Sequence, residues 1–430
     1  MTKVNAISAA TIGSEVIAEI NCKSGMESRD HSNGVSPKNQ RSRGNFLMLG
    51  VMALVCLFAV NAYGQCSPPW DGNGTQSDPW KISDNETSGN DVSAYISGST
   101  LYISGSNYMA DFWHSEQGES PWWCANRQDE IQTVEFQPGS NVKNIGERAF
   151  KDCSKLQTIT IPSSVTKING QSFFKCSSLH ILEIPNSVGT IEGEAFRGSG
   201  LKKLNIVNGN TGLVFTYSRD NDGIYYYDWF TDCPLEELHL GRNTDYPYVS
   251  DMESLFSKMQ KLQTLTIGET VTSIKNKTFV GCSNLENVTF QDGTAILYLG
   301  NAIGGVYPGC VIFTGSKITT LYIGRDILFY MGSDGILSSF QGNSALEILT
   351  IGEKVTAISD YSFYECPNIT AITVKNPKPP IIGNGTHKAF EDGIKSTCKR
   401  TANNFKVQFK LSKIELEFLE QIVGHLDKKK

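Results

Sequence analysis

Apolar residues recur every 23 positions through the middle of the chain, with the same residue types at each recurrence. Ile145, Ile168 and Ile191 show this spacing most simply. The same interval separates six further pairs, which are Phe150 and Phe173, Cys153 and Cys176, Leu156 and Leu179, Phe256 and Phe279, Leu262 and Leu285, and Phe340 and Phe363. A fixed period of this length predicts a repeat protein, in which each coil buries its apolar residues against the next.

The repeat unit contains one short predicted strand. It reads L-x-x-I-x-I-P-x-x-V-x-x-I-x-x-x-A-F-x-x-C-x-x, and apolar and polar residues alternate at the end of its first six positions as they do in a strand. The predicted strands end at Phe136, Ile161, Ile184, Ile206, Leu240, Ile267, Phe290, Ile323, Ile351 and Val374. We therefore expect a repeat solenoid of about ten coils that is mainly β, with short helical or irregular return segments.

A longer duplication is superimposed on the 23-residue unit. Leu238–Arg242 matches Leu321–Arg325, and Leu265–Glu269 matches Leu349–Glu353. Val214-Phe215 is aligned with Leu297-Tyr298 in the same scheme. Two blocks of about 84 residues therefore share one plan of insertions, and we expect the insertions to project from the same side of the solenoid.

These repeats resemble those of the BspA-like leucine-rich repeat proteins, a surface family frequent in gut and oral Bacteroidetes. The resemblance covers residues 131–398 and is carried by segments such as Ile161–Val165 and Ile191–Phe196. Leu101–Gly105 and Ser120–Trp123 are similar to the family's leader segment. The resemblance implies a leucine-rich-repeat-like right-handed coil, an extracellular solenoid that adheres to host matrix proteins. The chain departs from the family pattern at Lys399-Arg400-Thr401, where a further strand motif is expected.

The N-terminal region predicts export. Residues 45–64 have the form of a signal peptide, because basic residues precede the apolar run 46–60 and Ala62-Tyr63-Gly64 follows it. We expect cleavage between Gly64 and Gln65; an uncleaved anchor is the alternative. Residues 1–44 are an extended n-region or a misassigned start. The interpretation places the protein outside the cell or at the cell surface, associated with the outer membrane, with no transmembrane helix after cleavage.

The two flanks of the solenoid differ in composition. Residues 65–130 form a predicted N-terminal cap, with a hairpin of Val92–Ile96 and Leu101–Ser104. This cap contains five of the six tryptophans, namely Trp70, Trp80, Trp113, Trp122 and Trp123. Residues 399–430 are an atypical basic tail. A cap is expected because the first coil of a solenoid otherwise exposes its apolar end.

Charge and cysteine spacing exclude several kinds of site. The chain has 38 Lys and Arg against 44 Asp and Glu, a formal net charge of −6, which argues against nucleic-acid binding. One repeat position is occupied by Cys153, Cys176, Cys233, Cys282 and Cys366. Ser, Met or Asn occupies this position in other coils, so we interpret it as a packing position for buried free thiols. Cys66 and Cys124 could instead form a disulfide in the cap.

No pattern in the sequence indicates catalysis, a metal or a cofactor. The histidines are not spaced as zinc ligands, and no nucleophile motif or phosphate loop is present. Asp220–Gly223 is interpreted as the turn of a hairpin rather than as a calcium loop, because Val214–Tyr217 and Ile224–Tyr227 flank it as alternating strands. We therefore predict that the protein is not an enzyme.

Two surfaces are candidates for binding. Outward strand positions vary in identity at a fixed geometry; the residues singled out there are Glu183, Lys203, Glu237, His239 and Tyr322. Aromatic residues gather in the insertions, namely Tyr225, Tyr226, Tyr227, Trp229, Tyr246 and Tyr248. Tyrosine and tryptophan offer large contact area and a polar tip. The sequence therefore favours a secreted or cell-surface adhesion protein that binds host or extracellular proteins; glycan capture and a structural envelope role are the alternatives.

Overall fold

The computed structural model describes most of the region between Trp70 and Ile382. The described residues are 70–84, 89–112, 119–219, 225–247, 255–301, 312–329, 339–340, 342–359, 362–378 and 380–382. The chain divides into the units Met1–Gly64 and Gln65–Lys430, and every described residue belongs to the second. The signal peptide, its cleavage between Gly64 and Gln65 and the basic tail lie outside the described residues and stay predictions.

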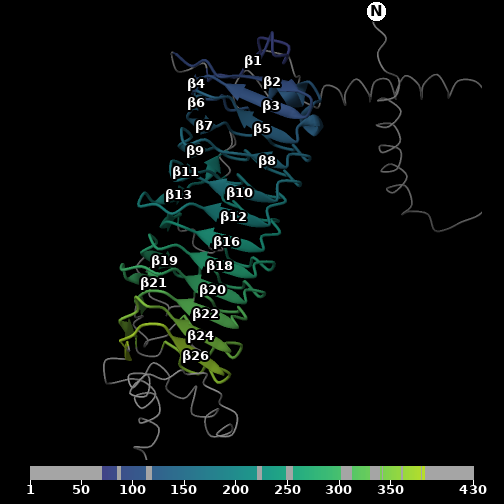
Figure 1. Cartoon of the computed structure of the whole chain (residues 1–430). Helices are drawn as coiled ribbons and strands as arrows, with labels where there is room; N and C mark the ends of the chain where they lie inside the picture. Colours follow the sequence, from purple (N-terminus) through teal and green to yellow (C-terminus); the bar gives the residue numbers. More distant parts are fainter. Residues whose placement is uncertain are drawn as a thin grey trace, which may run out of the picture. The chain divides into compact units, whose positions relative to one another are not determined.

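Each coil contributes one short strand, and the strands of successive coils pair in two separate sheets (Figure 1). Each of the ten predicted strand ends falls at or just after one of these strands. A five-stranded sheet contains β1 (Trp80–Lys81), β2 (Ser93–Ser97), β3 (Thr100–Ser104), β5 (Thr133–Phe136) and β8 (Thr158–Ile159). An eight-stranded parallel sheet contains β10 (Ile181–Ile184), β12 (Lys203–Ile206), β16 (Glu237–Leu240), β18 (Thr264–Ile267), β20 (Asn287–Phe290), β22 (Thr320–Ile323), β24 (Ile348–Ile351) and β26 (Ala371–Val374).

Two prolines coincide with the break between these sheets. In later coils the first N–H after a strand donates to the last carbonyl of the preceding strand, as Val207 N does to Ile184 O at 3.1 Å. Pro162 and Pro185 follow the strands on either side of the break and have no N–H to donate. The side chain of Ile161 stays buried, so the apolar core continues where the hydrogen-bond ladder is interrupted.

The return segments consist largely of turns and irregular chain, as predicted, but each described one also contains a short strand. Those that the structure describes build a second row of parallel strands, because neighbouring returns satisfy each other's backbone groups. One sheet of this row contains β7 (Asn144–Ile145), β9 (Lys167–Ile168), β11 (Thr190–Ile191), β13 (Leu213–Phe215) and β17 (Thr244–Asp245). The other contains β19 (Ser273–Lys275), β21 (Leu297–Asn301), β23 (Ile327–Phe329), β25 (Ala357–Ile358) and β27 (Ile381–Ile382).

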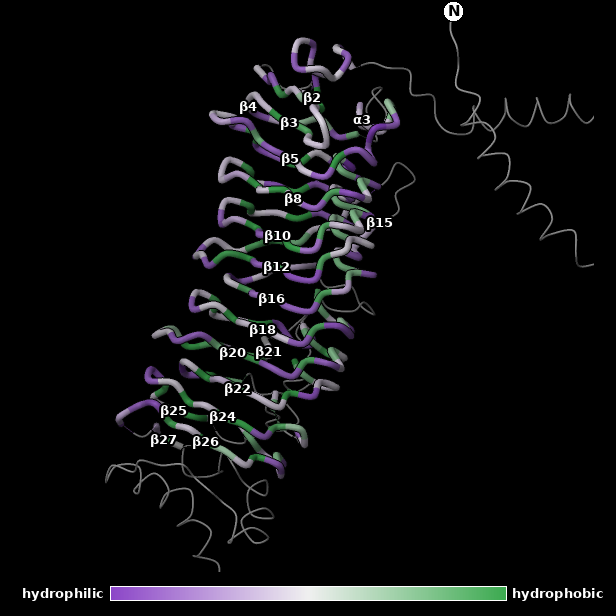
Figure 2. Tube along the Cα trace, turned by 45° about the vertical axis from the view of Figure 1, so that its right-hand side comes forward, coloured by the Kyte–Doolittle hydropathy of each residue, from purple (hydrophilic) through white to green (hydrophobic). Residues whose placement is uncertain are grey.

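A stack of phenylalanine rings runs through the core. Consecutive rings have centroids 5.2 to 5.9 Å apart and planes within 30° of parallel. The rings belong, in order, to Phe150, Phe173, Phe196, Phe230, Phe256, Phe279, Phe313, Phe340 and Phe363. Figure 2 shows apolar segments recurring from coil to coil. Each pair adds about 0.5–1.5 kcal/mol beyond simple burial, so the stack favours one register between coils.

The N-terminal segment extends this core. The predicted hairpin is present, since β2 pairs antiparallel with β3, and β3 pairs parallel with β5 of the first coil. Helix α3 (Pro121–Cys124) and the 3₁₀ turn η1 (Gln128–Glu130) follow; β4 (Ser106–Asn107) pairs with β6 (Asn141–Val142). Trp122 is fully buried, stacks on Phe150 at 6.1 Å and donates from Nε1 to Ala149 O at 2.8 Å. This segment therefore begins the aromatic stack.

The repeat cysteines are free thiols, as expected. Cys176 donates to Phe150 O at 3.0 Å, and Cys282 and Cys366 donate in the same way to Phe256 O and Phe340 O. Burial raises the pKa of the Cys282 thiol to about 12 and that of Cys366 to about 11. A thiol at this position can donate a weak hydrogen bond to the preceding coil, and these buried thiols are poor nucleophiles at neutral pH.

Cys124 is the one described cysteine outside this repeat position, and it is disulfide-bonded. Its pairing with Cys66 stays a prediction, since Cys66 lies outside the described residues.

Each 84-residue block buries one arginine. Arg242 is fully buried, and its Nη1 and Nη2 donate at 3.0 Å to Asn186 O and Pro185 O, two coils earlier. Arg325 is equally buried and donates at 2.6 and 2.7 Å to Glu269 O and Gly268 O. Burial lowers the pKa of both guanidinium groups to about 10. Each arginine therefore connects coils that do not pair directly.

Candidate functional site

Two columns of side chains face outward along the eight-stranded sheet, and strand register aligns them. The first column runs Ile181, Lys203, Glu237, Thr264, Asn287, Thr320, Ile348 and Ala371. The second runs Glu183, Asn205, His239, Thr266, Thr289, Tyr322, Thr350 and Thr373. We call this surface the strand face. It brings together the five strand residues singled out from the sequence, namely Glu183, Lys203, Glu237, His239 and Tyr322.

The charged residues of these columns lie at the N-terminal end of the sheet, on β10, β12 and β16. Lys203 Nζ and Glu237 Oε2 are 2.8 Å apart, with side chains 55% and 53% exposed. Asn205 Nδ2 donates to Glu183 Oε2 at 2.8 Å. These charged groups are exposed to water, so their pairing contributes little to stability. A binding partner can therefore replace these contacts with its own.

His239 is fixed by a residue from the preceding long coil. Its Nε2 lies 2.8 Å from Oδ1 of Asn208. Burial lowers the pKa of the imidazole, so the ring is neutral at neutral pH. A neutral ring that donates from Nε2 keeps Nδ1 as an acceptor.

Tyr322 is held in the corresponding way in the second block. Its hydroxyl donates to Asp292, with Oδ1 at 2.8 Å and Oδ2 at 2.9 Å. Lys375 Nζ lies 5.0 Å from the ring centroid. Desolvation, the hydrogen bond to Asp292 and the charges of Asp292 and Glu353 raise the pKa of Tyr322 to about 12. The tyrosine is therefore neutral and restricted in orientation.

The two holding residues, Asn208 and Asp292, were missed from the sequence. Each precedes a glycine and lies 84 positions from the other, and this duplicated Asn-Gly and Asp-Gly signal could have located them. Side chains at Gly241 and Gly268 would come within 2.6 Å of Asn208 Oδ1, and one at Gly352 would come equally close to Asp292 Oδ1. Glycine at these positions lets the long coil fold onto the edge of the strand face.

The aromatic insertion forms a hairpin, as predicted, but Val214-Phe215 is not its first strand, since these residues belong to β13 and pair in parallel with β11. Strands β14 (Ser218–Arg219) and β15 (Tyr225–Tyr226) pair antiparallel; the turn itself lies outside the described residues. Tyr217 and Tyr225 are 45% and 44% exposed and meet edge to face, with centroids 4.6 Å apart. The Arg219 guanidinium lies 5.3 Å from the Tyr225 centroid. This hairpin offers a compact exposed cluster of two tyrosines and one arginine.

Other residues of the predicted aromatic surface face inward. Trp229 is buried and donates from Nε1 to Thr216 O at 2.9 Å. Tyr246 is also buried, with its hydroxyl 3.1 Å from Thr278 Oγ1. Tyr226 and Tyr227 are half-buried, and Tyr227 packs on the core. Tyr248 lies outside the described residues. Trp229 and Tyr246 have little surface left for a ligand because the enlarged coils use them for packing.

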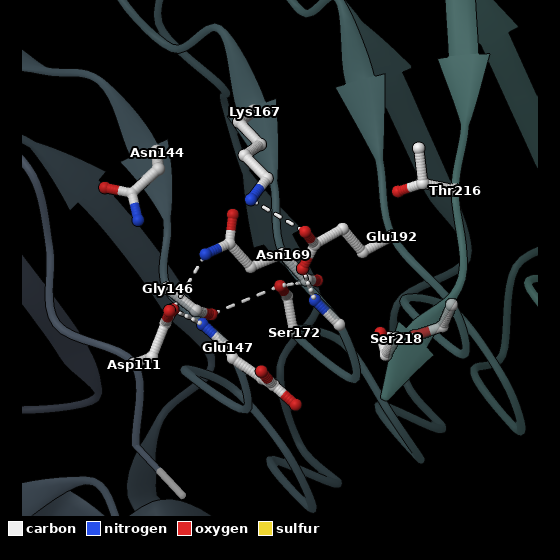
Figure 3. A network of polar contacts seen from close by, with 12 residues as sticks. Asp111, Asn144, Gly146, Glu147, Lys167, Asn169, Ser172, Glu192, Thr216 and Ser218 are labelled. Carbon is white, nitrogen blue, oxygen red and sulfur yellow. Dashed lines mark hydrogen bonds and ion pairs between the residues drawn. The ribbon is translucent and has the colours of Figure 1, made fainter. Parts of the chain in front are cut away.

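A polar network joins the N-terminal segment to the first coils (Figure 3). Asp111 Oδ1 accepts from Glu147 N and Asn169 Nδ2, both at 2.7 Å. Glu192 pairs with Lys167 Nζ at 2.7 Å and accepts from Gly170 N at 3.1 Å. These carboxylates hold protein groups together. Within the described ranges, no group of three or more histidine, cysteine or acidic side chains is placed to hold a metal ion.

No helix in the described part of the chain has the length and apolar composition needed to span a membrane.

The repeats match a known family model. Residues 126–217, 225–302 and 310–417 match the BspA type leucine rich repeat region, in six copies. These ranges cover more than half of the chain and extend past both predicted ends of the solenoid, at 131 and 398.

Several solved structures are similar to this chain. A leucine-rich repeat protein from Eubacterium ventriosum is 18% identical, with a TM-score of 0.25, over 70% of this chain and 92% of that one. One from Bacteroides ovatus is also 18% identical, with a TM-score of 0.25, over 68% and 76%. The pneumococcal vaccine antigen PcpA is 14% identical, with a TM-score of 0.23, over 69% and 88%. No curated protein matches.

Proposed function

The chain belongs to the BspA-type leucine-rich repeat family, and from this we propose that it is a secreted or cell-surface interaction protein that binds an extracellular protein through its strand face. The proposed activity is adhesion, without catalysis. A solenoid that holds varied side chains at fixed spacing presents an extended binding surface.

The observation that carries this proposal is the exposed charge pattern on β10, β12 and β16. Lys203 and Glu237 are in register on β12 and β16, and Glu183 lies in the second column, in register with Asn205. Lys202 and Glu236, at the strand starts, repeat the pairing at 3.7 Å. Alternating charges on a rigid sheet favour partners with the complementary pattern and disfavour others.

The aromatic hairpin is a second contact surface for the same partner. Tyr217 and Tyr225 are among the most exposed large hydrophobic side chains of the described residues. Tyrosine and arginine are enriched at the centres of protein interfaces. Two separate contacts on one scaffold would raise avidity if the partner can reach both.

Export to the cell surface is part of the proposal. The signal-peptide pattern of residues 45–64 supports it. N-terminal sequencing of protein recovered from outside the producing cell should begin at Gln65, because the small-residue site ends at Gly64. Recovery of chains that retain residues 1–44 would contradict export by this route.

Reversing the strand-face charges should weaken binding. We expect the exchange Lys203→Glu/Glu237→Lys to lower the association rate with a bound matrix protein by about three- to tenfold, and to reduce its dependence on salt. The free energy of unfolding should change by less than about 1 kcal/mol, because the pair is exposed and the exchange keeps opposite charges at the two positions. Surface plasmon resonance against immobilised extracellular-matrix proteins measures the rate.

The matched control is Arg127→Glu/Glu130→Arg, which exchanges an exposed pair in the N-terminal segment and should leave binding unchanged. Tyr217→Ser/Tyr225→Ser separates the hairpin contribution from that of the strand face. Equal binding by the wild type and the charge exchange would refute the strand-face site. Failure to bind any matrix protein would favour a structural envelope role.

A further inference from the structure

One part of the strand face, between β16 and β22, combines two fixed rings with an uncharged floor. We call it the strand-face window. His239 and Tyr322 bound it in the second column. The floor between them contains Thr264, Thr266, Asn287, Thr289 and Thr320. The two rings are three strand spacings apart, about 14 Å.

The floor offers hydrogen-bonding groups that the protein does not use. None of its four threonine hydroxyls, nor the Asn287 amide, has a side-chain hydrogen bond to another described residue. Every floor residue is at least partly exposed. Each threonine presents a methyl group beside its hydroxyl, so the floor alternates apolar and polar contacts at the spacing of the strands.

Hydrogen bonds within the protein fix the orientation of the His239 and Tyr322 rings without a ligand. Asn208 engages Nε2 of His239, and Asp292 engages the hydroxyl of Tyr322. The duplicated long coils supply both holding residues, so the arrangement is present in each block. A ring with its polar tip already bonded offers its remaining apolar surface, which for Tyr322 is the face opposite Lys375, and its restricted rotation lowers the entropy lost on binding.

Charge argues against an ionic ligand in the window. The Lys203–Glu237 pair borders it on one side, and the charged groups near Tyr322 are Asp292, which follows the floor strand β20, and Lys375. The floor itself has no charged side chain. Threonine is under-represented among the residues that dominate protein–protein binding energy, so a protein is also a poor match. A sugar polymer without charge has C–H faces for the rings and hydroxyls for the floor.

We propose that the strand-face window binds a neutral oligosaccharide segment, which lies across the strands with its ends against His239 and Tyr322. The site is separate from the charged pairs that support the proposed protein contact, and it goes beyond that function. A polysaccharide of the cell surface or the surrounding matrix would contain many such segments, so weak sites could act together.

Affinity electrophoresis of the full protein in gels that contain dextran, laminarin or galactomannan tests the proposal. At least one of these neutral polysaccharides should retard the protein, equally at low and high salt, because no ion pair is involved. Thr266→Val/Thr289→Val should weaken binding about tenfold, since it removes two hydroxyls and keeps the β-branched shape. Tyr322→Ala should weaken it by a similar factor.

The matched control is Thr350→Val/Thr373→Val, which makes the same change in the same column beyond the window and should leave retardation as in the wild type. No retardation by any neutral polysaccharide overturns the proposal, and so does equal retardation of the window variant. Retardation only by polygalacturonate, abolished by salt, would identify an acidic ligand instead. Loss of a matrix-protein contact in the window variant would make the window a protein site. The charge exchange at Lys203 and Glu237 should leave glycan binding intact, so the two proposals fail separately.

Discussion

Replacement of Phe173 by alanine is expected to lower the free energy of unfolding by about 3–5 kcal/mol. Phe173 is fully buried, and its ring lies between those of Phe150 and Phe196, at 5.4 and 5.5 Å. Truncation removes the apolar contact area and two aromatic contacts, and the stacked coils on either side leave little room for collapse. Urea unfolding followed by circular dichroism measures the change.

Phe174→Ala is the matched control, because the adjacent side chain is only partly buried and its ring lies near Lys175 Nζ. It should cost about 1 kcal/mol or less. A similar loss in both variants would show that the aromatic stack is not the main contact between coils. If Phe173→Ala lowered the free energy of unfolding by less than about 1 kcal/mol, the assignment of Phe173 and its stacked phenylalanines to the core would be wrong.

The second large effect is expected at the buried arginines. Arg242→Ala should lower the free energy of unfolding by about 2–4 kcal/mol. The variant leaves the carbonyls of Pro185 and Asn186 without the guanidinium donors, at about 1–3 kcal/mol each, and it opens a cavity. Relief of a buried charge offsets part of this loss. The same urea titration measures the result.

Arg325→Ala should lose a similar amount, because it makes the same contacts in the second block. Arg219→Ala is the control at an exposed position, with an expected change below about 1 kcal/mol. A neutral or stabilising effect of Arg242→Ala would show that the desolvation of the guanidinium outweighs its carbonyl contacts. The buried arginines would then lower the stability of the long coils rather than raise it.

The sequence predicted the coils well because burial imposes the repeat directly. Phe150, Phe173 and Phe196 recur at one interval and stack in the core. Each stacked coil must place its apolar residues over those of its neighbour, so the period in the sequence equals the length of one coil. The family resemblance rests on the same residues, and the match to the family model confirms it.

The candidate site was predicted only in part. The outward positions of Glu183, Lys203 and Tyr322 follow from alternation along each strand, and all three are outward in the structure. Trp229 and Tyr246 are buried instead, because an insertion has no fixed period that would separate its inner from its outer residues. The sequence alignment of Val214-Phe215 with Leu297-Tyr298 is also wrong by one residue. Val214 and Tyr298 both face outward, and a slip of one residue exchanges the two faces of a strand.

By itself, the sequence determined the repeat, the coil length and the columns of the core, because these depend on local alternation and on one period. Only the tertiary structure decided which distant groups meet. Asn208 reaches His239 and Asp292 reaches Tyr322 because long coils fold back onto the sheet. Arg242 joins carbonyls two coils away for the same reason. The duplicated Asn-Gly and Asp-Gly spacing marks the two holding residues, but their contacts depend on the path of the insertions in space, which this spacing does not specify.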